Sequence, residues 1–259
     1  MLIVLSPAKT LDYTSPIPPV PTTQPRFKRE AAELIALLRA LDPPALSRLM
    51  GISDRLAVLN ANRYAAWSRS FTADNSRAAL LAFDGDVYDG LAARGLSRED
   101  LEWAQRHVAV LSGLYGVLRP LDLMQPYRLE MGTRLANPAG RDLYAYWGTR
   151  IADALRAQLR GHAHPVLVNL ASDEYFGAVD FAALRHPTVQ PVFQDARGDG
   201  GYKVVGVYAK RARGMMARFA IEHRIDDPQA LKGFDAGGYR WTPDASDATR
   251  WVFRRRHAD

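Results

Sequence analysis

Two polar segments carry side chains that bind phosphate or transfer protons, and each follows a short apolar run. The first, Ser6–Asp12, contains Lys9 and hydroxyl groups, which together suit a phosphate. The second contains Asp173 and Glu174, and a carboxylate that faces a lysine is compatible with acid–base catalysis. The same residues also suit a structural ion pair, or a helix whose acidic first turn is capped by Ser172. Lys9, Asp173 and Glu174 are therefore the catalytic candidates.

A second candidate site is the turn from Gly51 to Ser53, which lies between two segments with helical spacing. Glycine permits a left-handed turn here, and Ile52 is expected to be buried as an anchor. The N–H groups at the start of the second helix suit a DNA phosphate. The pattern resembles the helix-hairpin-helix of sequence-independent DNA binders, although Ser53 stands where their second glycine is usual. An ordinary connection between two helices is the alternative.

The helix after this turn carries further polar side chains. Asp54 can cap the helix start and repel phosphate, whereas Arg48 and Arg55 offset its charge. Asn60 and Arg63 fall on the same helical face as apolar residues. Because a buried arginine is rare unless it is paired, Arg63 either meets an internal carboxylate or lines a cleft.

The segment 208–225 is the third candidate, because its spacing predicts a helix with one apolar stripe. The stripe consists of Ala212, Met215, Met216, Phe219 and His223. Cations occupy the remaining faces: Lys210, Arg211, Arg213, Arg218 and Arg224. This pattern predicts a helix that packs on one side and presents positive charge to DNA on the other. A solvated basic face and a membrane-surface helix share the pattern.

Composition excludes several classes of function. The 259 residues carry a net charge of +6 and a pI near 9.6, which favours an acidic partner such as DNA. Cysteine is absent, which excludes disulfides, thiolate metal sites and a cysteine nucleophile. The six histidines show no metal-binding motif, and the pair His162 and His164 lies in a turn, so we expect no metal site and no cofactor. No apolar run suits a membrane span or a signal peptide, which predicts a cytoplasmic protein.

The elements that position these residues predict a single α/β domain over residues 1–259, with a mixed sheet flanked by helices. The proline-rich residues 16–25 are expected to form a surface strap. Ligands of open sheets collect at the carboxyl ends of strands, so Lys9, Arg63 and Asp173 are expected to lie close together. The predicted strands are 2–5, 108–111, 166–170, 189–193, 202–207 and 250–253, and the predicted helices are 26–40, 43–50, 54–67, 97–107, 141–159 and 208–225.

Five segments spread from one end of the chain to the other are distinctive: Ser6–Asp12, Phe83–Tyr88, Leu111–Met131, Asn169–Phe176 and Tyr208–Gly214. Together these segments resemble the YaaA family of bacterial peroxide-stress proteins. The block 111–131 is long and unusual, so it is the most specific of them. The resemblance implies one mixed α/β domain with a basic cleft, and a helix-hairpin-helix element at about 43–67 that binds DNA. It also implies a role in limiting peroxide damage, linked to lowered free iron.

The resemblance also assigns residues. It places the hairpin at Gly51 to Ser53 and adds candidate cleft residues, namely Lys9, Arg63, Arg119, Arg128 and Lys210 to Arg213. The leading hypothesis is a monomeric, largely sequence-independent binder of duplex or distorted DNA, without enzymatic activity. The alternatives are an enzyme acting on a nucleotide or nucleobase, and an iron-handling protein, which the histidine and carboxylate pattern supports poorly. A binder tolerates the loss of Asp173 and Glu174, whereas an acid–base enzyme does not.

Overall fold

The centre of the fold is strand β1 (Leu2–Leu5), and all four of its residues are completely buried. The computed structural model describes residues 1–196, 198 and 200–256 of the chain. β1 pairs in parallel with β8 (Leu167–Leu170) on one side and with β5 (Val108–Ser112) on the other. An uninterrupted run of β-branched and leucine residues is typical of a strand covered on both faces.

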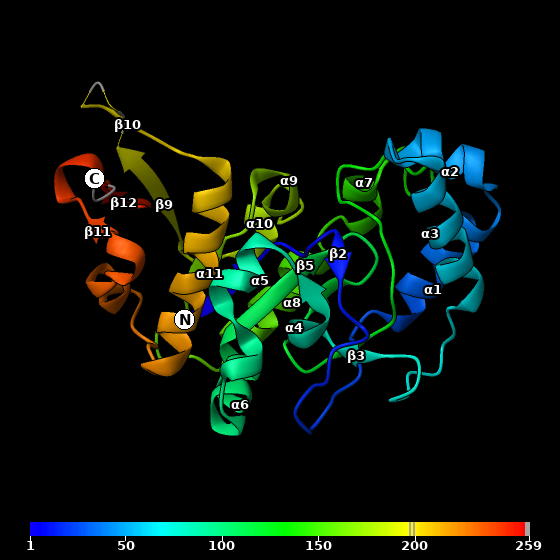
Figure 1. The fold of residues 1–259 in the computed structure, drawn as a ribbon, viewed down its shortest axis with the longest axis horizontal. Coiled ribbons are helices and arrows are strands. Elements are labelled where there is room, and N and C mark those ends of the chain that lie inside the picture. Colours follow the sequence, from blue (N-terminus) through cyan, green and yellow to red (C-terminus); the bar gives the residue numbers. More distant parts are fainter. Residues whose placement is uncertain (197, 199, 257–259) are drawn as a thin grey trace.

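Five further strands complete a mixed sheet of eight strands, which confirms the predicted α/β class (Figure 1). The order is β11-β12-β9-β8-β1-β5-β6, and β10 pairs with β9. β9 is parallel to β8 and β12, whereas β6, β10 and β11 pair antiparallel with their neighbours. Their bounds are β6 Gly116–Leu118, β9 Thr188–Ala196, β10 Tyr202–Lys203, β11 Arg240–Trp241 and β12 Arg250–Arg255.

Helices cover this sheet, and three of them gather at the end of the molecule opposite β11 and β12 (Figure 1). These three are α1 (Lys28–Arg39), α2 (Pro43–Met50) and α3 (Asp54–Ala66). The others are α4 Ala79–Ala82, α5 Asp86–Leu91, α6 Arg98–His107, α7 Leu143–Trp147, α8 Arg150–Leu159, α9 Asp173–Phe176, α10 Phe181–Leu184 and α11 Gly206–Glu222.

The remaining elements are short strand pairs, the proline-rich strap and short 3₁₀ helices. Short strands pair as β2 (Thr10–Leu11) with β4 (Phe83–Asp84), and as β3 (Arg77–Ala78) with β7 (Leu123–Met124). The proline-rich strap is fastened at Thr23, whose N–H donates to the Leu121 carbonyl at 2.8 Å and whose carbonyl accepts from the Leu123 N–H at 2.8 Å. Short 3₁₀ helices occupy 93–95, 228–233, 236–238 and 243–245.

Three local predictions are wrong, each for a local reason. The helix predicted at 141–159 is two helices, because Gly148 adopts φ +49° and ends α7 before α8 begins. The strand predicted at 202–207 ends at Lys203, because helix α11 already begins at Gly206. His223, predicted on the apolar stripe of α11, lies just beyond the last helical residue and is exposed.

Helices α5 and α11 lie against each other with backbone in contact with backbone. A Cβ atom added at Gly90 would lie 2.1 Å from the carbonyl oxygen of Arg211. A Cβ atom added at Gly214 would lie 1.8 Å from the carbonyl oxygen of Val87. Neither contact leaves room for a methyl group, and neither clash is with a movable side chain. The two glycines therefore set the distance between these helices.

We predict that Gly214→Ala lowers the free energy of unfolding by about 3 kcal/mol or more, because the added methyl group forces α11 away from α5. Gly206→Ala is the matched control, since a Cβ at Gly206 meets nothing within 4 Å and the residue lies in the same helix. Chemical denaturation of the two variants measures the difference. Equal stability of both variants would contradict the close contact.

Candidate functional site

A pocket of about 450 Å³ opens at the carboxyl ends of β1 and β8. The parallel pairing of these strands brings the segment after Leu5 and the segment after Leu170 to one edge of the sheet, where ligands of such sheets collect. Polar and charged side chains from five separate segments line the pocket: Ser6, Lys9, Asp84, Asp86, Arg128, Glu130, Ser172, Glu174, Lys210 and Arg213.

Two serines join the strand ends at the base of this pocket. The Ser172 N–H donates to Ser6 Oγ at 2.8 Å, and the Ser6 hydroxyl donates to Ser172 Oγ at 3.2 Å. Tyr88 adds a hydrogen bond of 3.0 Å from its hydroxyl to the Ser6 carbonyl. Ser172 occupies the N-cap position of α9, but its hydroxyl accepts no hydrogen bond from that helix. The serine pair thus holds the two strand ends together.

Lys9 lies in the pocket as predicted, but its ion-pair partner is Glu130. Lys9 Nζ lies 2.8 Å from Glu130 Oε2, and Arg128 Nη2 lies 3.0 Å from Glu130 Oε1. Burial acts to raise the pKa of Glu130, but the hydrogen bonds and charges of these two cations outweigh it and hold the pKa below its ordinary value. Glu130 was not predicted as a site residue. Its position within the distinctive block 111–131 is the feature of the sequence that could have indicated it.

The cations of the pocket face an equal number of carboxylates. Lys9, Arg128, Lys210 and Arg213 share the lining with Asp84, Asp86, Glu130 and Glu174. Lys210 Nζ lies 3.7 Å from Asp86 Oδ2. The two lysines are exposed, whereas the two arginines are partly buried and require such partners, since an unpaired charge is costly to remove from water. The pocket therefore has a lining of mixed charge, and it is not the uniformly basic cleft that the family resemblance implied.

The two carboxylates after β8 differ in their surroundings. Glu174 lines the pocket, and its Oε1 accepts a hydrogen bond of 2.9 Å from the Gly132 N–H. Asp173 is not part of the lining, but its charge acts on Arg213. Burial lowers the pKa of Arg213, and Asp173 opposes that shift. Glu174 is thus the better placed of the two predicted acids.

Arg63 lines a neighbouring cavity together with Tyr13 and Asp84, and Asp84 also lines the main pocket. Burial lowers the pKa of Arg63, while Tyr13 raises it. Among the described residues Arg63 has no ion-pair partner, so it lines a cleft and does not form the internal ion pair that was the alternative. Asn60 is completely buried and donates a hydrogen bond of 2.8 Å to the Leu56 carbonyl, so its amide is not presented to solvent.

Arg119 lies apart from this pocket. Its guanidinium Nη2 is 3.0 Å from Oδ1 of the buried Asp122, and it lines a different cavity. Two other arginines predicted for the cleft also lie in different cavities. Arg128 lines the main pocket, and Arg63 lines the neighbouring cavity. The cleft set implied by the family resemblance is thus distributed over three cavities.

The turn between α2 and α3 has the predicted geometry. Gly51 adopts φ +60°, in the left-handed region, and Ile52 is buried beneath the turn. Ser47 closes the turn, because its hydroxyl donates to the Ile52 carbonyl at 2.6 Å. Ser53 is the N-cap residue of α3, but its side chain accepts no hydrogen bond from the helix. The first N–H groups of α3 therefore lack a side-chain cap from this serine.

The cations around this turn are exposed. Arg48 lies in the last turn of α2 and Arg55 in the first turn of α3, and within the described residues neither forms an ion pair. The cations predicted for the 208–225 helix differ, because Arg218 of α11 donates to the Ala92 carbonyl at 2.8 Å and Arg224, beyond its end, donates to Asp100 at 2.6 Å. Of the α11 cations, Arg211 is exposed and without an ion pair in the same part of the chain.

No helix among the described residues combines the length and the apolar character needed to cross a membrane.

Comparison with known proteins places this architecture in a family. The family described as peroxide stress protein YaaA matches residues 1–245. The chain is 62% identical to a UPF0246 protein of Ralstonia nicotianae over the full length of both chains, and 58% identical to one of Albidiferax ferrireducens over 98% of both. A UPF0246 protein of Dechloromonas aromatica is 54% identical over the full length of both. The chain therefore belongs to the YaaA family of peroxide stress proteins.

Proposed function

We propose that this protein binds DNA largely without regard to sequence, and that this binding serves the response to peroxide stress. The observation that carries the proposal is the exposed start of α3 after the left-handed Gly51, where Ser53 provides no side-chain cap. Free N–H groups and the positive end of a helix suit a phosphate oxygen.

The surroundings of the hairpin favour an anionic backbone over a free anion. Arg48 and Arg55 stand on either side of the turn, exposed and without an ion pair among the described residues. Ile52 anchors the turn in the core, so the donors are held in place before binding. Asp54 lies in the first turn and opposes phosphate, which makes the two arginines necessary to the proposal.

Helix α3 also connects the hairpin to the charged pocket. Near its carboxyl end, the Tyr64 hydroxyl donates to the Arg128 carbonyl, and Arg128 lines the pocket. Arg63 precedes Tyr64 and lines the neighbouring cavity. A displaced or distorted nucleotide of DNA bound at the hairpin would find cations there, as part of the same proposal.

We predict that the affinity for unrelated duplexes is similar and falls steeply with salt, because bound phosphates release counterions. Arg48→Gln with Arg55→Gln should weaken binding to every duplex, and lower the slope of log K against log salt by roughly 2. The charge-matched control is Arg98→Gln with Arg160→Gln, two exposed arginines on α6 and at the end of α8. Fluorescence anisotropy over a salt series measures both slopes. Equal slopes for the two double variants would remove the hairpin from the proposal.

Gly51→Val tests the turn itself. A β-branched residue at φ +60° is strained by roughly 1–2 kcal/mol, so the turn should distort while the core remains folded. We expect DNA binding to fall in a variant whose circular dichroism spectrum is unchanged. If a well-folded Gly51→Val variant binds as tightly as the natural chain, the hairpin only connects two helices, and Lys210 and Arg211 of α11 must carry the contact.

An enzyme acting on a nucleotide or nucleobase is the second candidate, and the Lys9–Glu130 pair beside Glu174 in the pocket is the observation that favours it. Glu174→Gln with Asp173→Asn separates the two functions, because each change keeps the side-chain shape and removes the acid. We expect this variant to retain DNA binding and to restore peroxide survival to cells that lack the protein. Loss of survival with normal DNA binding would instead assign the function to the pocket.

A further inference from the structure

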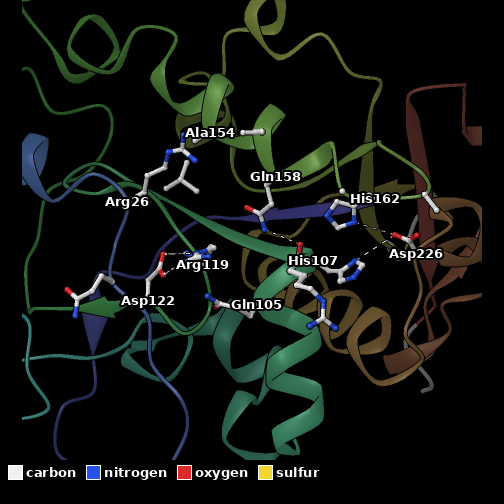
Figure 2. Close-up of a pocket in the computed structure, with 15 residues that line it drawn as sticks. Arg26, Gln105, His107, Arg119, Asp122, Ala154, Gln158, His162 and Asp226 are labelled. Atoms are coloured by element: carbon white, nitrogen blue, oxygen red, sulfur yellow. Dashed lines mark hydrogen bonds and ion pairs between the residues drawn. The ribbon is translucent and has the colours of Figure 1, made fainter.

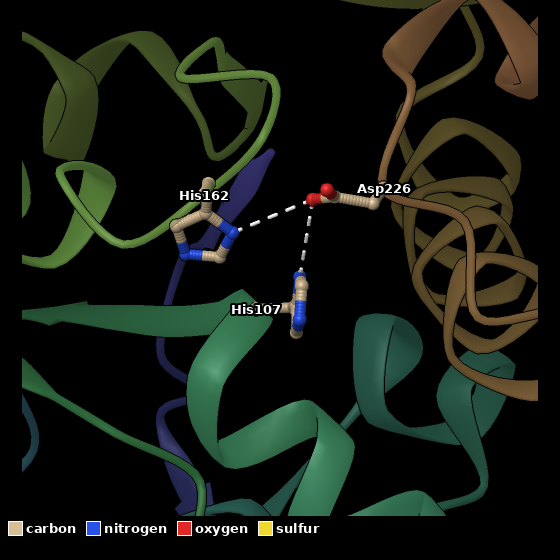
Figure 3. Close-up of side chains that lie close together, drawn as sticks. All are labelled: His107, His162 and Asp226. Atoms are coloured by element: carbon tan, nitrogen blue, oxygen red, sulfur yellow. Dashed lines mark hydrogen bonds and ion pairs between the residues drawn. The ribbon is translucent and has the colours of Figure 1, made fainter.

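Three side chains from distant parts of the sequence meet at the amino ends of the central strands (Figure 3). His107 ends α6 directly before β5, His162 lies in the turn between α8 and β8, and Asp226 follows α11. Both imidazole rings turn a nitrogen toward the carboxylate (Figure 3). This cluster lies at the opposite ends of the strands from the charged pocket.

The three groups lie slightly farther apart than the ligands of one metal ion. His162 Nδ1 lies 3.5 Å from Asp226 Oδ1, and His107 Nδ1 lies 3.7 Å from the same oxygen. All three ligand atoms lie within 4.8 Å of one another. Ligands at about 2.0–2.1 Å from a tetrahedral zinc ion are themselves separated by roughly 3.4 Å. Small side-chain movements would therefore bring all three atoms to one ion.

The surroundings keep the two imidazoles in the form that binds metals. Burial, together with the nearby His162 and α-amino group, lowers the pKa of His107 to about 4. Burial also lowers the pKa of His162. Both rings are therefore neutral at neutral pH, with a free nitrogen lone pair on each. The ring of His107 is stacked on Trp103 with centroids 3.9 Å apart, and His162 has a backbone hydrogen bond with Arg106, so both ring orientations are supported.

A positive charge already lies in this cluster. The α-amino group of Met1 donates to the Asp226 carboxylate and, at 3.0 Å, to the Asp226 carbonyl. The same nitrogen lies 3.4 Å from His162 Nδ1. His107 Nδ1 also lies 3.2 Å from the Met1 carbonyl; a metal ion bound to this nitrogen would take the place of its proton and of that hydrogen bond. The cluster thus accommodates a cation, and a metal ion would replace the contact between the ammonium group and the carboxylate.

The cluster lines one side of a cavity of about 810 Å³ (Figure 2). The cavity continues past Gln105 and Gln158 toward Arg119, so polar side chains line part of its wall. An ion held by three protein ligands requires a further ligand, such as water, and the cavity provides room for one. It also provides the path by which an ion reaches partly buried ligands.

From this arrangement we propose that His107, His162 and Asp226 bind a divalent first-row transition metal ion, with Zn²⁺ as the reference ion. Two imidazole nitrogens and one carboxylate form a donor set that suits such ions. Mg²⁺ and Ca²⁺ are disfavoured, because they prefer oxygen ligands. The proposal is independent of the DNA-binding hairpin.

The test is a titration of the full chain with Zn²⁺ and with Co²⁺, using a histidine-free tag at the carboxyl end so that Met1 keeps its contacts. Isothermal calorimetry should give one Zn²⁺ per chain, and Co²⁺ should produce the visible absorption of a tetrahedral site. His107→Asn and Asp226→Asn should each weaken Zn²⁺ binding roughly tenfold or more. Mg²⁺ in excess should not compete.

His164→Ala is the matched control, because His164 is exposed and lies two positions after His162. It should leave both the stoichiometry and the cobalt spectrum unchanged. Absence of stoichiometric binding would overturn the proposal. So would unchanged binding in folded His107→Asn and Asp226→Asn variants, or an equal loss in His164→Ala, which would point to scattered surface histidines. Circular dichroism establishes that each variant is folded, and DNA binding by the same variants should be unaffected.

Discussion

The parallel pairing of β1 with β8 and β5 is the constraint on which both candidate sites depend. β1 is completely buried, so its register against both neighbours is held by packing on two faces as well as by hydrogen bonds. Its carboxyl end carries Lys9 to the pocket that Glu174 also lines. Its amino end brings Met1 to the cluster of His107, His162 and Asp226. A one-residue slip in this pairing would disrupt both ends together.

Charge is distributed according to burial. In the pocket, the partly buried Arg128 is paired with Glu130, as the cost of removing charge from water requires, and the exposed Lys9 shares the same carboxylate. The close contact of α5 and α11 brings Lys210 to the same pocket, again beside a carboxylate. The exposed hairpin differs, because there water solvates Arg48 and Arg55 and no partner is needed. We therefore expect Arg48 and Arg55 at the hairpin, rather than the paired cations of the pocket, to bind phosphate.

Local patterns in the sequence predict much of the fold. The apolar run 2–5 and the left-handed turn at Gly51 both appear in the structure as predicted. The single helix predicted at 141–159 is wrong, since periodicity does not report the left-handed conformation of one glycine. The sites are harder to predict, because their contacts join distant segments. Nothing local indicates that Lys9 pairs with Glu130, or that two histidines and an aspartate far apart in the sequence meet.

Two observations support the proposed DNA-binding role. The chain belongs to a family of peroxide stress proteins, and the start of α3 at the hairpin is exposed and has no side-chain cap from Ser53. Hydrogen–deuterium exchange of the chain with and without a duplex tests that role most directly. If the hairpin holds the phosphates, exchange should slow in peptides that cover Gly51 to Arg55 when DNA is bound, and should stay unchanged in α6. Unchanged exchange at the hairpin, with protection confined to α11 or to the pocket, would contradict the proposed role.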